Sequence, residues 1–501
     1  MLRRCWPLLV ALLTVGWTPC VSAQSVFDQI GLTALRDRLG PGAPTGAGIA
    51  VMHAEAIESS PPPAYLPDPA NPEFVGKTFN DHSGGGGISG HATGVGAIFY
   101  GFFGGVAPDI TEIHNYRVQG NLDSGDWFGP AYLNFGAGVP VSAANQRVQN
   151  HSWIDTDPFD ANSQRASRRY DFALRRDNVI GVVGVNNGSA SPIPALLANS
   201  YNSIAVGLTN ANSSFGPTTG DVVGRSKPDI VGPTGATSFA TPLVAGSAAL
   251  LLNTADAKTD PTERLHAGRM ESIKAALLTG ATKSEFAGLA QPWTRTNNGS
   301  YVEPLDRRFG AGELNINNSH LILSAPEKRG TDTALANGAG WSFDTLTAND
   351  AVRHFYLNVV GDPTTSFTAT VTWLRRITPT GTGTDVFDTS TATLSDIELR
   401  LFEANPDFSL GTLVDSSVSP IDNVQHIFQP GLTSHLYALE VRLAGLPSGQ
   451  TSEDFAVAWF TTVAPVPEPG TLALCALAAA AVLALRRRRG LRRSSKIAAS
   501  G

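Results

Sequence analysis

The chain has 501 residues, of which 16% are charged and 42% are hydrophobic, and its formal net charge is −7. A folded chain of this length exceeds what one hydrophobic core usually covers, so we expect two domains. Residues 1–23 and 464–501 together carry a net +8, which leaves −15 on the part between them. So acidic a body argues against a nucleic-acid partner.

The N-terminal residues 1–23 have the layout of a secretory signal peptide. Two arginines precede an apolar run from Trp6 to Trp17, and small residues follow up to Ala23. This order predicts export and cleavage after Ala23. The three cysteines, Cys5, Cys20 and Cys475, lie in the two end segments, so the exported body cannot rely on disulfides or on thiolate metal sites.

Between residue 45 and residue 320, short β-branched runs alternate with helical patterns. The predicted strands are Ala47–Val51, Asn145–Trp153, Asn178–Val185 and Ser203–Leu208. The predicted helices are Arg165–Arg176, Pro242–Asn253 and Met270–Leu278. This alternation predicts an α/β fold with a parallel sheet covered by helices on both faces.

From Gly330 onward the pattern changes to strands separated by turn residues. The predicted strands are Phe355–Val360, Ser366–Leu374, Asp396–Phe402 and His435–Arg442. We therefore predict an antiparallel β-sandwich over residues 330–463. It resembles the accessory sandwiches of secreted bacterial peptidases. Isolated aspartates such as Asp396 and Asp422 do not define a metal site, so no cofactor is assigned and structural calcium stays open.

The strongest chemical signal is the run of residues 235–242, Gly-Ala-Thr-Ser-Phe-Ala-Thr-Pro. Small residues before Ser238 allow a tight turn into a helix, where backbone N–H groups and the helix dipole favour a developing oxyanion. Pro242 is expected in the first turn, where its missing N–H has no partner to lose. Local physics alone favours an ordinary N-capping serine over a nucleophile.

The same run resembles the subtilase signature Gly-Thr-Ser-Met-Ala-x-Pro-x-Val-Ala-Gly. Residues 214–217, 224–233, 273–281 and 309–315 also look like subtilase segments, so the resemblance covers most of residues 45–320. It implies a subtilisin-like peptidase domain, placed at residues 24–325. It also implies a serine endopeptidase that hydrolyses protein or peptide substrates, with Ser238 as nucleophile.

The histidine of the implied triad is His91. Its segment, Gly90-His-Ala-Thr-Gly-Val-Gly96, resembles the subtilase run His-Gly-Thr-His-Val-Ala-Gly. The resemblance implies that His91 takes the proton of Ser238 and later donates it to the leaving amine. The alternative is a surface histidine without a catalytic role.

The resemblance also implies a side-chain donor for the oxyanion. The segment from Val179 to Gly188 matches the subtilase run Ala-Ala-Gly-Asn at Asn186, with Val185 in place of the glycine. An amide at this position acts on the tetrahedral oxygen. Asn187 takes this role if the register slips by one residue.

The acid is where the sequence departs from the family. Ungapped alignment puts His53 on the subtilase aspartate, and a neutral histidine cannot supply an anion. Glu55 lies two residues after His53, so it points to the same face of the strand, about 6.6 Å further along. For Glu55 to serve as the triad acid, the strand should need a bulge or an early end. Asp81 is another candidate. With no acid at all, the protein would be an impaired enzyme that acts as a surface binding or structural component.

The C-terminal segment of residues 465–490 combines Val-Pro-Glu-Pro, an apolar run and four arginines, and residues 491–501 form a basic tail. This order resembles the PEP-CTERM sorting signal of Gram-negative bacteria. It implies a transient inner-membrane helix with its arginines in the cytoplasm, and removal by an exosortase-type peptidase. The expected destination is the cell envelope or the medium. A plain membrane anchor is the alternative.

Overall fold

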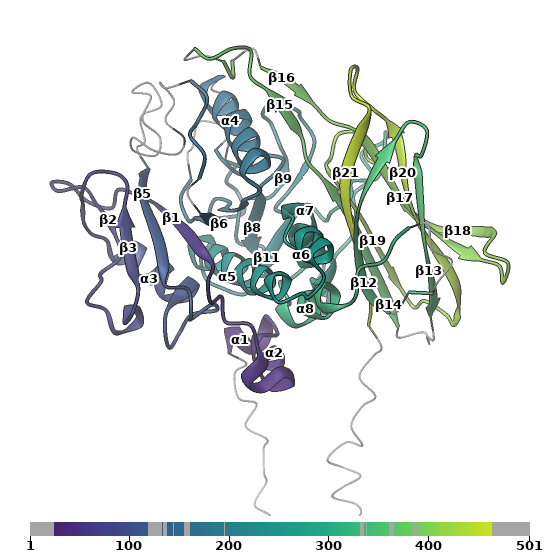
Figure 1. The fold of residues 1–501 in the computed structure, drawn as a ribbon, viewed down its shortest axis with the longest axis horizontal. Coiled ribbons are helices and arrows are strands. Elements are labelled where there is room, and N and C mark those ends of the chain that lie inside the picture. Colours follow the sequence, from purple (N-terminus) through teal and green to yellow (C-terminus); the bar gives the residue numbers. More distant parts are fainter. Residues whose placement is uncertain are drawn as a thin grey trace, which may run out of the picture.

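The protein was analysed as a computed structural model that describes residues 25–118, 133, 138–143, 145–154, 161–194, 196–330, 335–336, 338–359, 365–383, 386–388 and 390–462. The predicted signal peptide and the predicted sorting segment lie outside these residues. Within them, an α/β part is followed by an all-β part (Figure 1).

The α/β part is built on a seven-stranded sheet in which every neighbouring pair is parallel. Its order is β11-β8-β7-β6-β1-β5-β3. The strands are β1 Ala50–Ala56, β3 Thr78–Asp81, β5 Glu112–Val118, β6 Gln146–His151, β7 Ile180–Gly184, β8 Ile204–Leu208 and β11 Ile230–Gly232. Short strands β2 Ala64–Leu66, β4 Gly87–Ile88, β9 Gly216–Pro217 and β10 Ser226–Lys227 form two small sheets.

Helices cover both faces of this sheet, as predicted. An added Cβ at Gly181 of β7 would meet Tyr170 of helix α4, Ala161–Asp177. An added Cβ at Gly184 would meet Thr241 of helix α5, Thr237–Asp256. Because residues 181 and 184 point to opposite faces of the strand, α4 and α5 lie on opposite sides. The other helices are α1 Val26–Gln29, α2 Leu32–Leu39, α3 Gly90–Tyr100, α6 Pro261–Ala267, α7 Met270–Gly280 and α8 Ile316–Ser324.

The first strand begins and ends later than predicted. The prediction was Ala47–Val51, but β1 covers Ala50–Ala56. Gly46 and Gly48 have φ values of +83° and +79°, which keep the chain in a turn before β1. The later end has a functional consequence, because it brings His53 and Glu55 into the buried strand.

The position of Pro242 in α5 also differs from the prediction. The helix begins at Thr237, so Pro242 lies in its second turn rather than its first. Its missing N–H would have bonded the carbonyl oxygen of Ser238, four residues earlier. That oxygen instead accepts a hydrogen bond of 2.9 Å from the Ser152 hydroxyl. Pro242 therefore frees a carbonyl that ties the start of α5 to the neighbouring loop. Although α5 is long and apolar enough to cross a membrane, it is a buried core helix.

The all-β part consists of two four-stranded antiparallel sheets, as the sequence predicts for a sandwich. Their orders are β12-β21-β14-β19 and β13-β20-β17-β18. Aromatic and aliphatic residues of both sheets, among them Phe367, Leu439 and Trp459, form one core. The strands are β12 Ala339–Thr347, β13 Val352–Val359, β14 Ser366–Trp373, β17 Asp396–Ala404, β18 Leu410–Ser417, β19 Val424–Pro430, β20 His435–Gly445 and β21 Ser452–Thr462, with a separate ribbon of β15 Arg376–Thr378 and β16 Thr391–Thr393.

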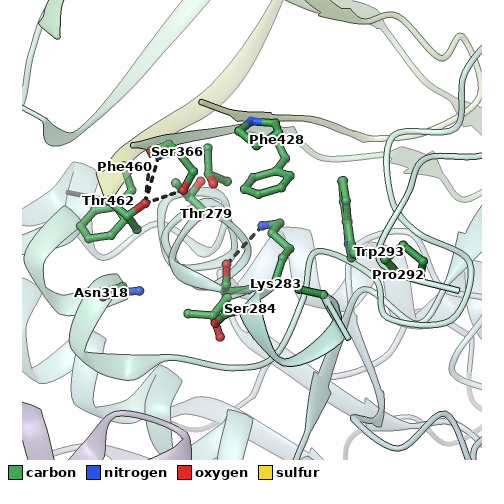
Figure 2. Close-up of a pocket in the computed structure, with 15 residues that line it drawn as sticks. Thr279, Lys283, Ser284, Pro292, Trp293, Asn318, Ser366, Phe428, Phe460 and Thr462 are labelled. Atoms are coloured by element: carbon green, nitrogen blue, oxygen red, sulfur yellow. Dashed lines mark hydrogen bonds between the residues drawn. The ribbon is translucent and has the colours of Figure 1, made fainter. Parts of the chain in front are cut away.

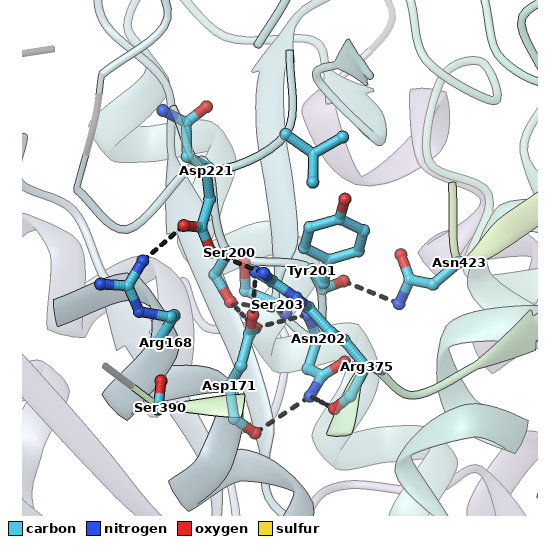
Figure 3. Close-up of polar contacts among 12 residues, drawn as sticks. Arg168, Asp171, Ser200, Tyr201, Asn202, Ser203, Asp221, Arg375, Ser390 and Asn423 are labelled. Atoms are coloured by element: carbon cyan, nitrogen blue, oxygen red, sulfur yellow. Dashed lines mark hydrogen bonds and ion pairs between the residues drawn. The ribbon is translucent and has the colours of Figure 1, made fainter. Parts of the chain in front are cut away.

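The two parts are joined by apolar and polar contacts. Trp341, Leu374 and Val424 of the sandwich belong to the core cluster of the α/β part. Beside them, the Asn202 side chain donates to the carbonyl oxygens of Asp171 and Arg375, and it accepts from the Arg375 N–H (Figure 3). The sandwich thus packs directly against the α/β part.

Replacing Asn202 with alanine should lower the free energy of unfolding by about 2–3 kcal/mol, because it leaves buried backbone groups of both parts without partners. Urea unfolding of the full chain measures this change. The matched control is Asn212→Ala, since Asn212 is exposed and, among the described residues, only its backbone is hydrogen bonded. Equal stability of the two variants would contradict the prediction.

Candidate active site

The candidate site lies at the carboxyl ends of the parallel strands, where β1 has β6 on one side and β5 on the other. Chain connections diverge at such a point, and the loops beyond the strands leave a crevice. Glu55 is the last but one residue of β1 and is 2% exposed. His91 is the second residue of α3, and Ser238 is the second residue of α5.

Glu55 and His91 are joined by a hydrogen bond between their side chains. The Nδ1 atom of His91 donates to the Glu55 Oε1 atom at 3.0 Å. Ser89 caps α3 through a hydrogen bond from the Ala92 N–H, and Glu58 accepts from the His91 N–H, so the start of the helix is fixed. The hydrogen bond to Glu55 raises the pKa of His91 above its ordinary value, against the opposing effect of partial burial.

His53 lies behind Glu55 and completes a buried chain of polar groups. Its Nε2 atom is 3.4 Å from the Glu55 Oε2 atom, and its Nδ1 atom is 2.8 Å from the Tyr100 hydroxyl. Burial raises the pKa of Glu55, but the hydrogen bonds and charges of His53 and His91 outweigh this effect and lower it below its ordinary value. Glu55 is therefore a carboxylate held between two imidazoles.

Glu55 reaches His91 without the irregularity that the sequence led us to expect. Strand β1 continues to Ala56, and Glu55 pairs in regular register with Arg117 of β5. The register shift between β1 and β6 falls at Ala50 and Val51, far from Glu55. The requirement for a bulge or an early strand end was wrong, because Glu55 bonds His91 from a strand that stays regular through Ala56.

Asp81 does not contact His91. Its carboxylate accepts hydrogen bonds from the Tyr65 hydroxyl and from the backbone N–H groups of Ser83 and Gly85. It therefore organises the glycine-rich loop that follows β3. Of the two acids that the sequence offered, the structure brings only Glu55 to the histidine.

Ser238 lies at the amino end of α5 and is half-buried. Its hydroxyl donates to the carbonyl oxygen of Ser152 at 3.4 Å, and among the described hydrogen bonds none joins it to His91. The His91 ring packs against the next residue, Phe239, with ring centroids 6.1 Å apart. The backbone N–H of Ser238 has no acceptor among the described residues, as is usual in the first turn of a helix.

Asn186 and Asn187 follow β7 and have different partners. The Asn187 side chain accepts from the Thr237 N–H at 2.9 Å and so caps α5. The Asn186 backbone bonds Ser214, while its side-chain amide makes no hydrogen bond within the described chain. Both asparagines line a cavity of about 50 Å³ with Ser238. The amide of Asn186 is thus available to a group bound there.

Metal ligands do not gather in this region. Among the described residues, no group of three or more histidine, cysteine or acidic side chains could hold a metal ion. What the arrangement offers is a hydroxyl at a helix start, an imidazole with a buried carboxylate behind it, and two N–H donors.

The comparisons with solved structures return proteases, one of which is described as subtilisin-like. The prenylagaramide maturation protease PagA is 20% identical over 58% of this chain and 98% of its own, with a TM-score of 0.35. A serine protease of Aeromonas sobria is 12% identical over 83% and 88%, with a TM-score of 0.34. A cold-adapted subtilisin-like serine proteinase is 18% identical over 49% and 86%, with a TM-score of 0.33. No curated protein sequence matches the chain.

The comparison with family profiles matches two segments. Residues 63–312 match the subtilase family, and residues 465–489 match the PEP-CTERM protein-sorting motif. His91, Asn186 and Ser238 lie inside the first segment, whereas β1 with Glu55 precedes it. The chain is therefore a member of the subtilase family that carries a PEP-CTERM sorting motif near its C-terminus.

Proposed function

We propose that the protein is an active serine endopeptidase in which Ser238, His91 and Glu55 form the triad. The observation that carries this proposal is the 3.0 Å hydrogen bond from His91 to the buried Glu55 carboxylate, beside a serine at a helix start. A carboxylate in this position holds the imidazole in the correct tautomer and stabilises the imidazolium that forms. The subtilase fold supports a serine peptidase that acts on protein or peptide substrates.

In the proposed reaction, substrate binding turns the Ser238 hydroxyl from the Ser152 carbonyl toward His91. Catalytic hydrogen bonds are often loose in a free enzyme and tighten when substrate binds. His91 takes the proton as Ser238 attacks the scissile carbonyl carbon. The carbonyl oxygen becomes an oxyanion that accepts from the Asn186 amide and the Ser238 N–H. His91 then returns the proton to the leaving amine, and water hydrolyses the acyl-enzyme by the same relay.

A fluorophosphonate probe tests this proposal, because it phosphonylates only a serine that its own active site activates. We expect an adduct on the peptide that contains Ser238 when the full chain is treated and digested for mass spectrometry. The Ser238→Ala and His91→Ala variants serve as controls and should stay unlabelled. Absence of an adduct on the parent chain would favour the alternative, a subtilase-fold protein with a binding or structural role.

The cavity beside Ser238 favours a small, uncharged side chain before the scissile bond. It holds about 50 Å³, and the described residues that line it, which include Trp153 and Val185, carry no charge. We expect peptides with alanine at this position to have a higher kcat/KM than those with phenylalanine, roughly 10-fold or more. A Val185→Ala variant should reduce the ratio of kcat/KM between alanine and phenylalanine peptides, because it enlarges the cavity. A parent enzyme that prefers phenylalanine would contradict this assignment.

The sorting motif implies export to the cell envelope. We further propose processing by an exosortase-type peptidase in a Gram-negative cell, after transient anchoring in the inner membrane. The domain limits of 24–325 and 330–463 belong to the same proposal. They are supported by the end of α8 at Ser324 and the start of β12 at Ala339.

A further inference from the structure

A large cavity lies where the sandwich meets the α/β part. None of the triad residues lines it. It holds about 570 Å³ and is partly open to solvent. One wall comes from the end of α7 and the segment after it, and the other from strands β14, β19 and β21 (Figure 2). Its surface is mostly apolar, with Trp293, Phe428 and Phe460 as the aromatic contributors.

Lys283 brings a positive charge into this apolar cavity. The residue is 8% exposed, and its Nζ atom lies 5.1 Å from the ring centre of Phe428 and 5.4 Å from that of Trp293. Among the described residues, its only hydrogen-bond acceptor is the Ala281 carbonyl oxygen, at 3.1 Å. Figure 2 shows the amine directed toward the Phe428 ring.

The other buried lysines of the described chain are better compensated. Lys227 pairs with the Asp229 carboxylate at 2.7 Å. Lys274 donates to two carbonyl oxygens, and the negative charge of Asp229 raises its pKa against the effect of burial. Among the described residues, Lys283 has no carboxylate within ion-pair distance. Burial lowers its pKa to about 7, and the charge of Glu285 acts in the opposite direction. A buried cation that lacks a counter-ion is costly, and such costs concentrate at functional sites.

The two aromatic faces favour the charged form of the Lys283 amine but supply no counter-ion. Cation–π contacts stabilise the charge but leave the hydrogen-bonding capacity of the amine available, so N–H donors remain for a ligand. A carboxylate would supply the missing counter-ion, while an apolar body next to it would fill the aromatic part of the cavity.

We propose that this cavity binds a carboxylate with an apolar body, whose anionic group pairs with Lys283 and whose apolar part packs against Trp293 and Phe428. Two sources share this chemistry: a free aryl or alkyl acid, and the C-terminus of a peptide that ends in an apolar residue. The cavity lies at the interface between the α/β part and the sandwich. Ligand binding there does not depend on the proposed peptidase activity.

Isothermal titration calorimetry of the full chain carrying Ser238→Ala tests the proposal, since this variant cannot consume a peptide. The probes are 4-phenylbutyrate, its uncharged carboxamide, and a pentapeptide ending in phenylalanine as the free acid or the amide. We expect 4-phenylbutyrate to bind, and its carboxamide and the Lys283→Met variant to show at least a roughly tenfold loss of affinity. Binding of the peptide acid but not of its amide would assign the peptide terminus as an additional ligand.

Two variants separate loss of the site from loss of the fold. Lys283→Met should unfold at a higher temperature than the parent, because it removes an uncompensated buried charge. Lys258→Met is the matched control. Lys258 also lies over a tryptophan ring, that of Trp341, but it is paired with Glu263. This variant should bind 4-phenylbutyrate as tightly as the parent chain does. Failure of 4-phenylbutyrate to bind the parent chain, or equal binding to Lys283→Met, would overturn the proposal.

Discussion

Replacing Glu55 with glutamine is expected to reduce kcat about 10⁴-fold while leaving the fold intact, because loss of the triad acid leaves the imidazole without its orienting anion. Glutamine has the same shape and can still hydrogen bond His91 and His53. The charge that stabilises the imidazolium is what disappears. The measurement is peptide hydrolysis under saturating substrate, with circular dichroism to verify folding.

Asp81→Asn is the matched control for this variant. Asp81 also ends a strand of the same sheet and also accepts hydrogen bonds from its surroundings, but it has no contact with His91. We expect Asp81→Asn to retain the kcat of the parent enzyme. Retention of the parental kcat by Glu55→Gln would show that the enzyme works without this acid.

Asn186→Ala should lower kcat by about 10²–10³-fold, with a smaller effect on KM, because an oxyanion donor acts mainly in the transition state. The amide has no other partner in the described chain, so its removal costs little stability. Initial rates over a range of substrate concentrations separate the two constants.

Asn187→Ala provides the comparison. This side chain caps α5, so its loss should cost about 1 kcal/mol of stability, with less effect on kcat than Asn186→Ala. If Asn187→Ala lost more activity than Asn186→Ala, the oxyanion would be assigned to the wrong asparagine.

The parallel sheet could be predicted from short β-branched runs that alternate with helical patterns, and the sandwich from alternating strands separated by turn residues. Strands β7 and β8 were placed within two residues of their observed limits. Strand β5 was missed, because His114, Asn115 and Arg117 interrupt its apolar pattern although most of the strand is buried. The tertiary environment, rather than hydrophobic periodicity, decides that strand.

For the site, the segments around Ser238 and His91 could be identified because they resemble subtilase signatures, whereas their small residues alone did not single out a nucleophile. The acid was ambiguous, since His53 occupies its usual place and the match to the family begins after β1. The contact of Glu55 with His91 depends on how α3 is placed over β1, which no local pattern specifies. Likewise, the Lys283 cavity joins segments that are distant in the chain, so only the fold reveals it.

Titration of the His91 ring by NMR, in the parent chain and in Glu55→Gln, tests the central claim most directly. The hydrogen bond to Glu55 raises the pKa of His91, so the neutral ring that accepts the serine proton should prevail only at pH values above that raised pKa. Glu55→Gln should lower the pKa of His91 and shift the rising limb of the rate profile to lower pH. An unchanged pKa of His91 in this variant would contradict the assignment of Glu55 as the acid of the triad.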